Sequence, residues 1–121
     1  MDKIFKAKRI DNGEWVEFDS IIHCNEKCYF FKYGSGDFDS IPLSKGMEID
    51  KNTICQYTGI DDSEGNRIFE GDEVSLYDEE FIVKFSEGEF VGDNSNFKYG
   101  ILSVAELSRT LLTGHNIHDK V

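Results

Sequence analysis

The chain has 121 residues and a formal net charge of -11, and 39% of its residues are hydrophobic. One domain is the expectation at this length, and ten Phe, five Tyr and one Trp supply the bulky side chains that a folded core needs. A surface this acidic repels phosphate backbones and anionic lipid headgroups, so the composition disfavours direct nucleic-acid binding and a membrane-surface role.

The negative charge is concentrated in residues 61–93. This segment holds twelve acidic residues against Arg67 and Lys84, which accounts for -10 of the net charge. The first ten residues hold four basic residues against one acidic residue. The simplest interpretation of the acidic segment is a solvated surface, and the functional alternatives are a face for a basic protein partner and nucleic-acid mimicry.

The sequence shows no signal peptide and no membrane span. The start at 1–5 has no apolar core behind it, and no window approaches the roughly 18 apolar residues that cross a bilayer. The three cysteines are an odd number, so they form no closed set of disulfides, and a reducing compartment suits them best. We therefore expect a cytoplasmic protein.

Strand patterns dominate the first half of the chain. Residues 3–10 alternate apolar and charged side chains, a turn follows at 11–14, and a strand resumes at 15–18, which predicts a hairpin with Val16, Phe18 and Ile22 on one face. Residues 27–33 predict an aromatic third strand, broken at 34–37 by glycines. Pro42 argues against a central strand at 41–43, and 49–52 are expected to turn.

The second half continues in strands. Strand-rich runs lie at 53–58, 67–69, 73–77, 80–86 and 90–91, and 92–96 are expected to form a loop. The turn at 61–66 lacks the glycine spacing and the bidentate acid of a calcium loop. We interpret it as a hairpin turn in which Gly65 or Asn66 has positive φ. At the corner Glu70-Gly71-Asp72, Gly71 permits a sharp change of direction and Asp72 can accept backbone N–H bonds.

One helix is predicted near 103–110. Ser103 and Glu106 have the spacing of a capping box, and Val104, Leu107 and Leu111 lie on one helical face. Two endings are possible: Gly114 caps the helix, or the helix ends near Arg109 and the chain goes extended at 110–113. Together these elements predict a mostly β fold, a small barrel or curled sheet, with an N-terminal β-hairpin or meander.

Catalytic and metal-binding patterns are weak. The residue types that ligate metals are His23, Cys24, Cys28, His115 and His118. If Cys24 and Cys28 share one strand, they lie on the same side but roughly 13 Å apart, which does not suit zinc. Cys55 has no elbow motif or base that would make it a nucleophile. We therefore predict no catalytic residue, no cofactor and no metal ligand.

The aromatic strand at 27–33 suggests a contact surface. Tyr29, Phe31 and Tyr33 alternate on one face, with Cys28, Phe30 and Lys32 on the other, as read from the sequence. A small domain has difficulty covering both faces, so we expect self-association or a protein partner.

The residues at 56–59, Gln-Tyr-Thr-Gly, followed by the polar turn and by Ile68-Phe69-Glu70-Gly71-Asp72-Glu73-Val74, resemble the signature of the YopX family. The opening Ala-Lys-Arg at 7–9 with Asp-Asn-Gly-Glu-Trp-Val at 11–16, and the closing Asn-Ile-His-Asp at 116–119, are also similar to that family. His115 departs from it, because a glycine usually precedes the closing asparagine. The segments 20–48 and 92–108 show no family pattern.

The YopX proteins are small proteins of bacteriophages and prophages, so the resemblance implies a bacterial host cell. It also implies an SH3-like barrel in the C-terminal half and a closing strand, which favours the earlier helix end. The expected organisation is one domain over 1–121, with a possible division into a meander at 1–50 and a barrel at 51–121. The family carries no established activity, so no site residue is transferred from it.

We expect a non-enzymatic phage or prophage accessory protein that binds another protein or itself. The alternative is a nucleic-acid-associated regulator that uses Lys3, Lys6, Lys8 and Arg9, which is an analogy with other SH3-like barrels. A third and weaker hypothesis is a small enzyme, which would need one of the three histidines to meet a carboxylate or a cysteine in a cleft.

Overall fold

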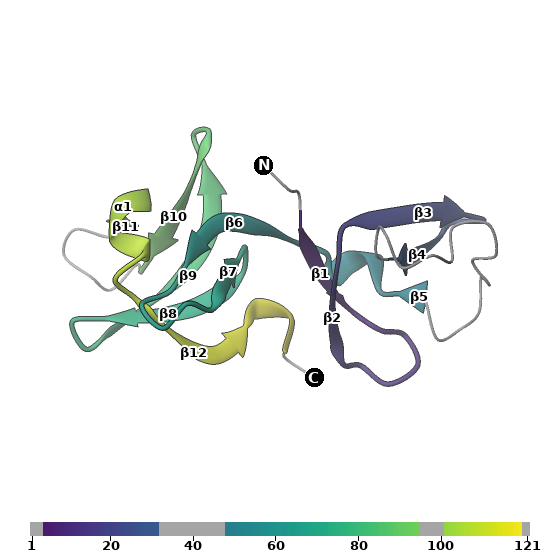
Figure 1. Ribbon diagram of the computed structural model, residues 1–121, viewed down its shortest axis with the longest axis horizontal. Helices are drawn as coiled ribbons and strands as arrows, with labels where there is room; N and C mark the ends of the chain where they lie inside the picture. The colour runs from purple at the N-terminus through teal and green to yellow at the C-terminus, as the bar shows by residue number, and fades with distance from the viewer. Residues whose placement is uncertain (1–3, 32–47, 95–100, 120–121) are drawn as a thin grey trace. The chain divides into compact units, whose positions relative to one another are not determined.

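The computed structural model describes residues 4–31, 48–94 and 101–119, and their regular structure is mostly β (Figure 1). This confirms the predicted fold class at that level. The chain forms two compact units, Met1–Gln56 and Tyr57–Val121, which we describe in turn. The single domain with a possible division near residue 50 stays a prediction. In the described ranges, no helix has the length and apolar character needed to cross a membrane.

The described strands of the N-terminal unit are β1 (Phe5–Lys8), β2 (Trp15–Phe18), β3 (Ser20–Cys24), β4 (Lys27–Phe31) and β5 (Glu48–Ile49). β1 pairs with β2, β3 with β4, and β4 with β5, all antiparallel. β5 returns to the end of β1, since the amide of Asp50 donates to the carbonyl of Lys8 at 2.8 Å. Because Asp19 alone separates β2 from β3, these pairings curl around the unit as a half-barrel.

The half-barrel encloses a small core of Ala7, Phe18, Cys28 and Ile49. Ile21 packs against this core, and Ile22 is not among the residues that do. The prediction that Ile22 continues the face of Val16 and Phe18 is therefore wrong. The strand breaks at Asp19, so the alternation of faces shifts by one residue between β2 and β3.

The turn between β3 and β4 corrects a second prediction. Cys24 ends β3 and Cys28 lies in β4, so the two cysteines do not share a strand. The turn residues Asn25 and Glu26 have φ of 51° and 64°, as the two-residue turn of a tight hairpin requires. Glutamate rarely takes this conformation, so the sequence pattern does not indicate the turn.

Several predictions for the N-terminal unit concern residues that lie partly or wholly outside the described ranges. The predicted strand at 27–33 is observed as far as Phe31. The expectations for Lys32, Tyr33, the break at 34–37 and Pro42 lie outside the described residues. The predicted turn at 49–52 is partly wrong, because Ile49 belongs to β5 and Asp50 caps a 3-10 turn over Lys51–Thr53.

The C-terminal unit continues from β6 (Cys55–Asp61), whose first residues pair with β1. The described strands that follow are β7 (Arg67–Phe69), β8 (Asp72–Leu76), β9 (Glu79–Ser86), β10 (Glu89–Asp93), β11 (Ile101–Leu102) and β12 (Leu111–Asn116). The helical turn α1 (Val104–Leu107) lies between β11 and β12, and a 3-10 turn follows β12 at Ile117–Asp119. β6 pairs with β7. The other strands form an antiparallel sheet in the order β11-β10-β9-β8-β12. Its inner face and α1 enclose Ile68, Val74, Phe81, Val83, Leu102 and Leu107.

The loop predicted at 92–96 begins too early. β10 runs through Asp93, with Gly92 opposite Val83. A Cβ at Gly92 would lie 3.2 Å from the Cβ of Phe81 and 3.3 Å from two side-chain atoms of Leu102. Glycine therefore serves close packing at this position rather than a turn.

The helix region is shorter than predicted. Ser103 and Glu106 form the predicted capping box, but α1 is a single turn that ends at Leu107. The extended alternative after Arg109 is confirmed, since β12 begins at Leu111. Leu111 therefore does not share a helical face with Leu107, and Gly114 lies within β12 rather than capping the helix.

Candidate functional site

The Glu70-Gly71-Asp72 corner has a structural role in the C-terminal unit. Gly71 has φ of 87°, and a Cβ there would lie 3.0 Å from a side-chain carbon of Ile117, so only glycine fits without a shift. Asp72 accepts the amide of Phe69 at 2.8 Å and the side-chain amide of Asn116 at 2.9 Å. These contacts confirm the predicted roles of Gly71 and Asp72 and give the carboxylate a folding function.

The predicted hairpin turn at 61–66 is also confirmed, with Gly65 at φ 86°. Asp62 organises it, because its Oδ1 accepts the amides of Glu64 and Asn66 at 2.9 and 2.8 Å. Its Oδ2 accepts the amide of Leu112 at 3.1 Å, which ties the turn to β12. Burial raises the pKa of Asp62, but the hydrogen bonds from the amides of Asn66, Leu112 and Glu64 outweigh burial, and the net pKa is lowered.

We expect Asp62 to make the stability of this unit depend on pH. A lowered folded-state pKa means that ionised Asp62 stabilises the fold above its unfolded pKa, near pH 4. That contribution is lost as the pH falls through the folded-state pKa. Asp62→Asn should cost about 1–2 kcal/mol at neutral pH and lose less stability below about pH 4 than the parent chain. Urea unfolding at a series of pH values from 6 to 2 measures the free energy of unfolding of both proteins. If this free energy falls equally in the parent chain and in Asp62→Asn, Asp62 is not the source of the pH dependence.

The candidate metal-ligand residues are divided between the two units. His23 and Cys28 lie opposite each other on β3 and β4, with the His23 Nδ1 and Cys28 Sγ 3.2 Å apart. Cys24 pairs with Lys27 across the same hairpin. His115 and His118 belong to the C-terminal unit. In the ranges that the structure describes, no three His, Cys, Asp or Glu side chains are placed to share a metal ion.

Tyr57, in the recognisable Gln-Tyr-Thr-Gly segment, belongs to a surface cluster on β6 and β7. Its hydroxyl donates to the carboxylate of Asp61 at 2.5 Å, and the guanidinium of Arg67 lies 5.8 Å from its ring centroid. Burial raises the pKa of the Tyr57 hydroxyl, Asp61 raises it further, and Arg67 opposes the shift. The phenol therefore stays protonated at neutral pH and acts as a hydrogen-bond donor.

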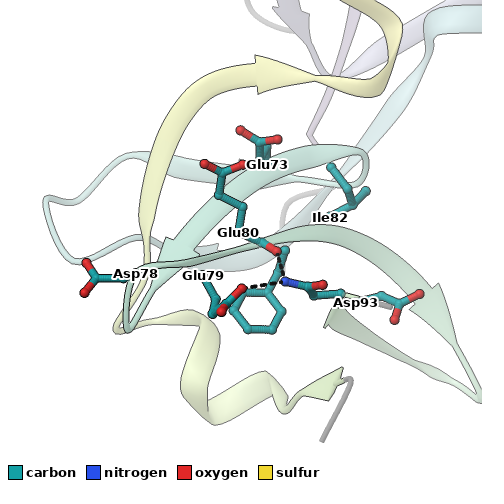
Figure 2. Close-up of a pocket in the computed structure, with 8 residues that line it drawn as sticks. Glu73, Asp78, Glu79, Glu80, Ile82 and Asp93 are labelled. Atoms are coloured by element: carbon teal, nitrogen blue, oxygen red, sulfur yellow. Dashed lines mark hydrogen bonds between the residues drawn. The ribbon is translucent and has the colours of Figure 1, made fainter. Parts of the chain in front are cut away.

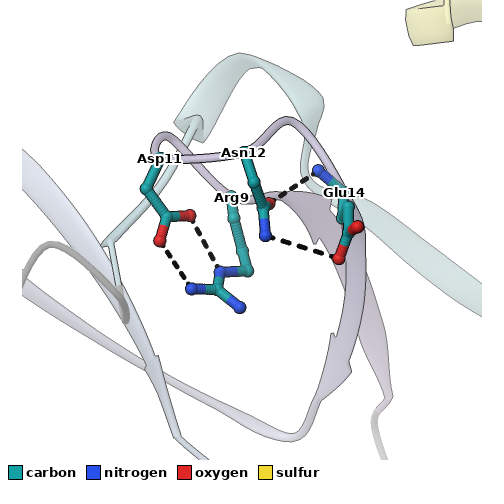
Figure 3. A network of polar contacts seen from close by, with 4 residues as sticks. All are labelled: Arg9, Asp11, Asn12 and Glu14. Carbon is teal, nitrogen blue, oxygen red and sulfur yellow. Dashed lines mark hydrogen bonds and ion pairs between the residues drawn. The ribbon is translucent and has the colours of Figure 1, made fainter.

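Three of the four basic residues at the start of the chain, Lys6, Lys8 and Arg9, have partners within the N-terminal unit, and Lys3 lies outside the described residues. The ammonium groups of Lys6 and Lys8 lie 4.7 and 5.5 Å from the ring centroid of Trp15. Arg9 makes a two-point ion pair with Asp11, at 2.9 and 2.6 Å (Figure 3). A paired guanidinium has less to offer a phosphate, which weakens the nucleic-acid alternative.

A gel shift tests that alternative directly. We expect no shift of single- or double-stranded DNA at low salt, because the net charge of -11 opposes the approach of a polyanion. A shift that disappears with added salt and with Lys6→Glu/Lys8→Glu would contradict this expectation.

An acidic groove lies on the C-terminal unit, with a volume of about 480 Å³. Of the described residues that line it, five are acidic and none is basic: Glu73, Asp78, Glu79, Glu80, Phe81, Ile82, Asp93 and Asn94. Figure 2 shows the Glu73 and Glu80 side chains on the same side of the sheet. The register explains this, because Glu73 pairs with Ile82 and Ser75 pairs with Glu80, so alternate residues of β8 and β9 share the outer face.

Neighbouring groups hold parts of the groove in place. The side-chain amide of Asn94 donates to the backbone carbonyl of Glu80 at 2.7 Å and to the carboxylate of Glu79 at 3.3 Å. Thr113 donates to Glu73 at 2.7 Å, and Lys84 forms an ion pair with Asp93. The carboxylates thus stand on a hydrogen-bonded sheet, and their arrangement suits contact with a cationic surface better than proton transfer.

The structure divides the acidic segment between the interior and the surface of the C-terminal unit. The sequence placed twelve acidic residues in 61–93, and the structure turns Asp62 and Asp72 into the interior, where they bind backbone amides. Five of the others line one groove. Sequence reasoning identified the segment but not this grouping, because the grouping follows from the registers of β8, β9 and β10.

No curated protein is similar enough in sequence to count as a match. The family described as YopX protein matches residues 4–116, from just before β1 to the end of β12. This match covers nearly all of the chain and confirms the resemblance carried by the Gln-Tyr-Thr-Gly and Glu-Gly-Asp segments. The chain therefore belongs to the YopX protein family.

Proposed function

We propose that this chain is a non-enzymatic accessory protein of a phage or prophage and acts by binding another protein through the outer face of its C-terminal sheet. The acidic groove carries this proposal, since five acidic residues line it and the strand register places Glu73, Glu80 and Asp93 on the outer face. Such a surface favours encounter with a positively charged partner and opposes encounter with nucleic acid or anionic lipid. The non-enzymatic part rests on the lack of a catalytic motif in the sequence.

We further infer that the C-terminal unit is an SH3-like barrel. Three consecutive antiparallel strands, β8, β9 and β10, support this inference. After them the chain makes the single helical turn α1, and β12 returns to pair with β8. This order is the one expected of a small curled barrel with a helical turn before its last strand, and small barrels of this kind commonly present ligands with a rigid surface.

Affinity capture with matched variants tests the proposed function. The bait is the full chain in lysates of host bacteria, before and after prophage induction. Glu80→Lys reverses a charge in the groove, and Glu89→Lys reverses an exposed charge at the far end of the same sheet. We expect a partner that the parent chain and Glu89→Lys retain and that Glu80→Lys loses, because the variant repels the cations that approach the groove.

Two outcomes would contradict the proposal: no protein retained above background, or equal retention by Glu80→Lys and Glu89→Lys. A concentration series in the analytical ultracentrifuge covers the remaining case, in which the partner is a second copy of this chain. Self-association that Glu80→Lys abolishes would assign the groove to contacts between copies.

A further inference from the structure

Two exposed apolar side chains lie at the end of the sheet that borders the acidic groove. We define the Tyr77–Leu111 patch by its two large side chains, which are 69% and 40% exposed. Leu111 pairs with Ser75, and Ser75 pairs with Glu80, so these three residues form one row across β12, β8 and β9. Tyr77 follows Ser75 by two residues, in the turn just after β8, so it lies at the same end of the sheet as Leu111.

Tyr77 contributes little to the fold at this position. It lies in the turn between β8 and β9, with φ of 54°, and Asp78 beside it has φ of 62°. Asparagine or glycine satisfies this turn with less strain than an aromatic residue. The ring is largely exposed and is not part of the core of the C-terminal unit. Its contact area is therefore available to another molecule, and tyrosine is enriched among residues that dominate binding energy.

The surrounding charge identifies the kind of partner. Glu80 lies in the same row as Leu111, and Asp78 follows Tyr77 directly; both carboxylates line the groove. Residues 57–121 as a whole carry fourteen acidic residues against five basic ones. An apolar contact flanked by carboxylates suits a segment that carries both apolar and cationic side chains, whereas an acidic segment would be repelled.

We propose that the Tyr77–Leu111 patch binds an apolar side chain of a partner protein's basic segment, whose Lys or Arg residues lie against Asp78 and Glu80. This inference rests on the proposed function and specifies its partner: a short cationic amphipathic segment of another protein. The apolar contact supplies most of the affinity, and the carboxylates supply orientation and a fast, salt-dependent association.

The experiment uses the full chain and three short fluorescent peptides, which differ only in side-chain chemistry. One alternates Lys and Leu, the second alternates Lys and Ser, and the third alternates Glu and Leu. Fluorescence anisotropy at increasing salt measures each affinity. The Lys-Leu peptide should bind most tightly, with the affinity falling as salt rises. The Lys-Ser peptide should bind at least about tenfold more weakly, since it lacks the apolar anchor, and the Glu-Leu peptide should not bind.

Variants locate the contact. Tyr77→Asn removes the ring and suits the positive φ, and Leu111→Thr keeps a residue that favours strands. Each should weaken the Lys-Leu peptide by about tenfold. Phe85→Thr is the matched control, because Phe85 is 55% exposed on the same sheet and lies outside both patch and groove. Thermal melts of all three variants show whether they remain folded.

The inference is overturned if no peptide binds, if the Glu-Leu peptide binds as well as the Lys-Leu peptide, or if Phe85→Thr weakens binding as much as Tyr77→Asn does. These results would leave the proposed function standing if the capture experiment still yields a partner that Glu80→Lys loses. If the capture experiment yields no such partner but the Lys-Leu peptide still binds, the proposed function fails. The patch is then a surface that binds basic peptides.

Discussion

Phe81→Ala should lower the free energy of unfolding of the C-terminal unit by about 3–5 kcal/mol. Phe81 is 1% exposed and lies in β9, the central strand of the sheet, within the core formed with Val74, Val83 and Leu102. Removing the ring loses its burial and leaves a cavity that the paired strands on both sides cannot fill. Urea unfolding followed by far-UV circular dichroism measures the loss.

The same strand provides the control. Phe85→Ala removes the same ring four residues along β9, where it is 55% exposed and contacts Phe90 edge-on, with ring centroids 5.1 Å apart. We expect a loss below about 1 kcal/mol. Similar losses in the two variants would contradict the position of the core, as would a Phe81→Ala protein as stable as the parent.

Asp72→Ala should cost about 2–5 kcal/mol, the second large effect. Asp72 is 3% exposed, and its two oxygens accept the Phe69 amide and the Asn116 side-chain amide. Alanine removes the acceptor of both buried donors, and a buried donor that loses its acceptor carries a penalty of about 1–3 kcal/mol, although the Asn116 amide also reaches the carbonyl of Glu70 at 3.5 Å. The corner then loses its link to the end of β12, so the closing strand should also lose amide-exchange protection.

Urea unfolding and hydrogen exchange measure this effect, with Glu89→Ala as the control. Glu89 is an exposed acid of the same sheet, so its removal should change the free energy of unfolding by less than about 0.5 kcal/mol. If Asp72→Ala unfolds at the same urea concentration as Glu89→Ala, Asp72 has no structural role at the corner. Loss of stability without loss of protection in β12 would contradict the proposed link.

The strands could be predicted where core side chains recur at every second position and a glycine marks the turn that follows. Phe81 and Val83 alternate with Ile82 and Lys84, and Gly88 marks the turn that follows β9. By the same alternation Phe85 falls on the face of Phe81 and Val83, yet it is 55% exposed. A periodic pattern indicates which face a residue is on, and tertiary packing decides whether that face is covered.

Turns were predictable only where their residues favour positive φ. Positive φ was expected at Gly65 or Asn66 and occurs at Gly65, and Gly71, expected to allow a sharp change of direction, also has positive φ. The turns at Asn25-Glu26 and Tyr77-Asp78 were not expected, since Glu and Tyr rarely adopt this conformation, yet the tight pairing of the flanking strands imposes it. Because the first of these turns was not expected, the sequence left open a shared strand for Cys24 and Cys28, which the structure excludes.

The sequence predicted that the candidate site is acidic, but not which carboxylates share a surface. The acidic segment at 61–93 is plain in the sequence. Which carboxylates share a face depends on the pairing of Glu73 with Ile82 and of Ile82 with Asp93, which are long-range registers. Alternation along one strand cannot supply these pairings, because the neighbouring strand is free to slide until the whole sheet and its core are formed.

The central claim is that the outer face of the C-terminal sheet binds a protein partner. The most direct measurement is the affinity of the captured partner for the parent chain, Glu80→Lys and Glu89→Lys, by titration calorimetry at two salt concentrations. We predict that Glu80→Lys weakens binding by about tenfold or more and reduces its salt dependence, while Glu89→Lys matches the parent. Equal affinities for all three proteins at both salt concentrations would contradict the claim.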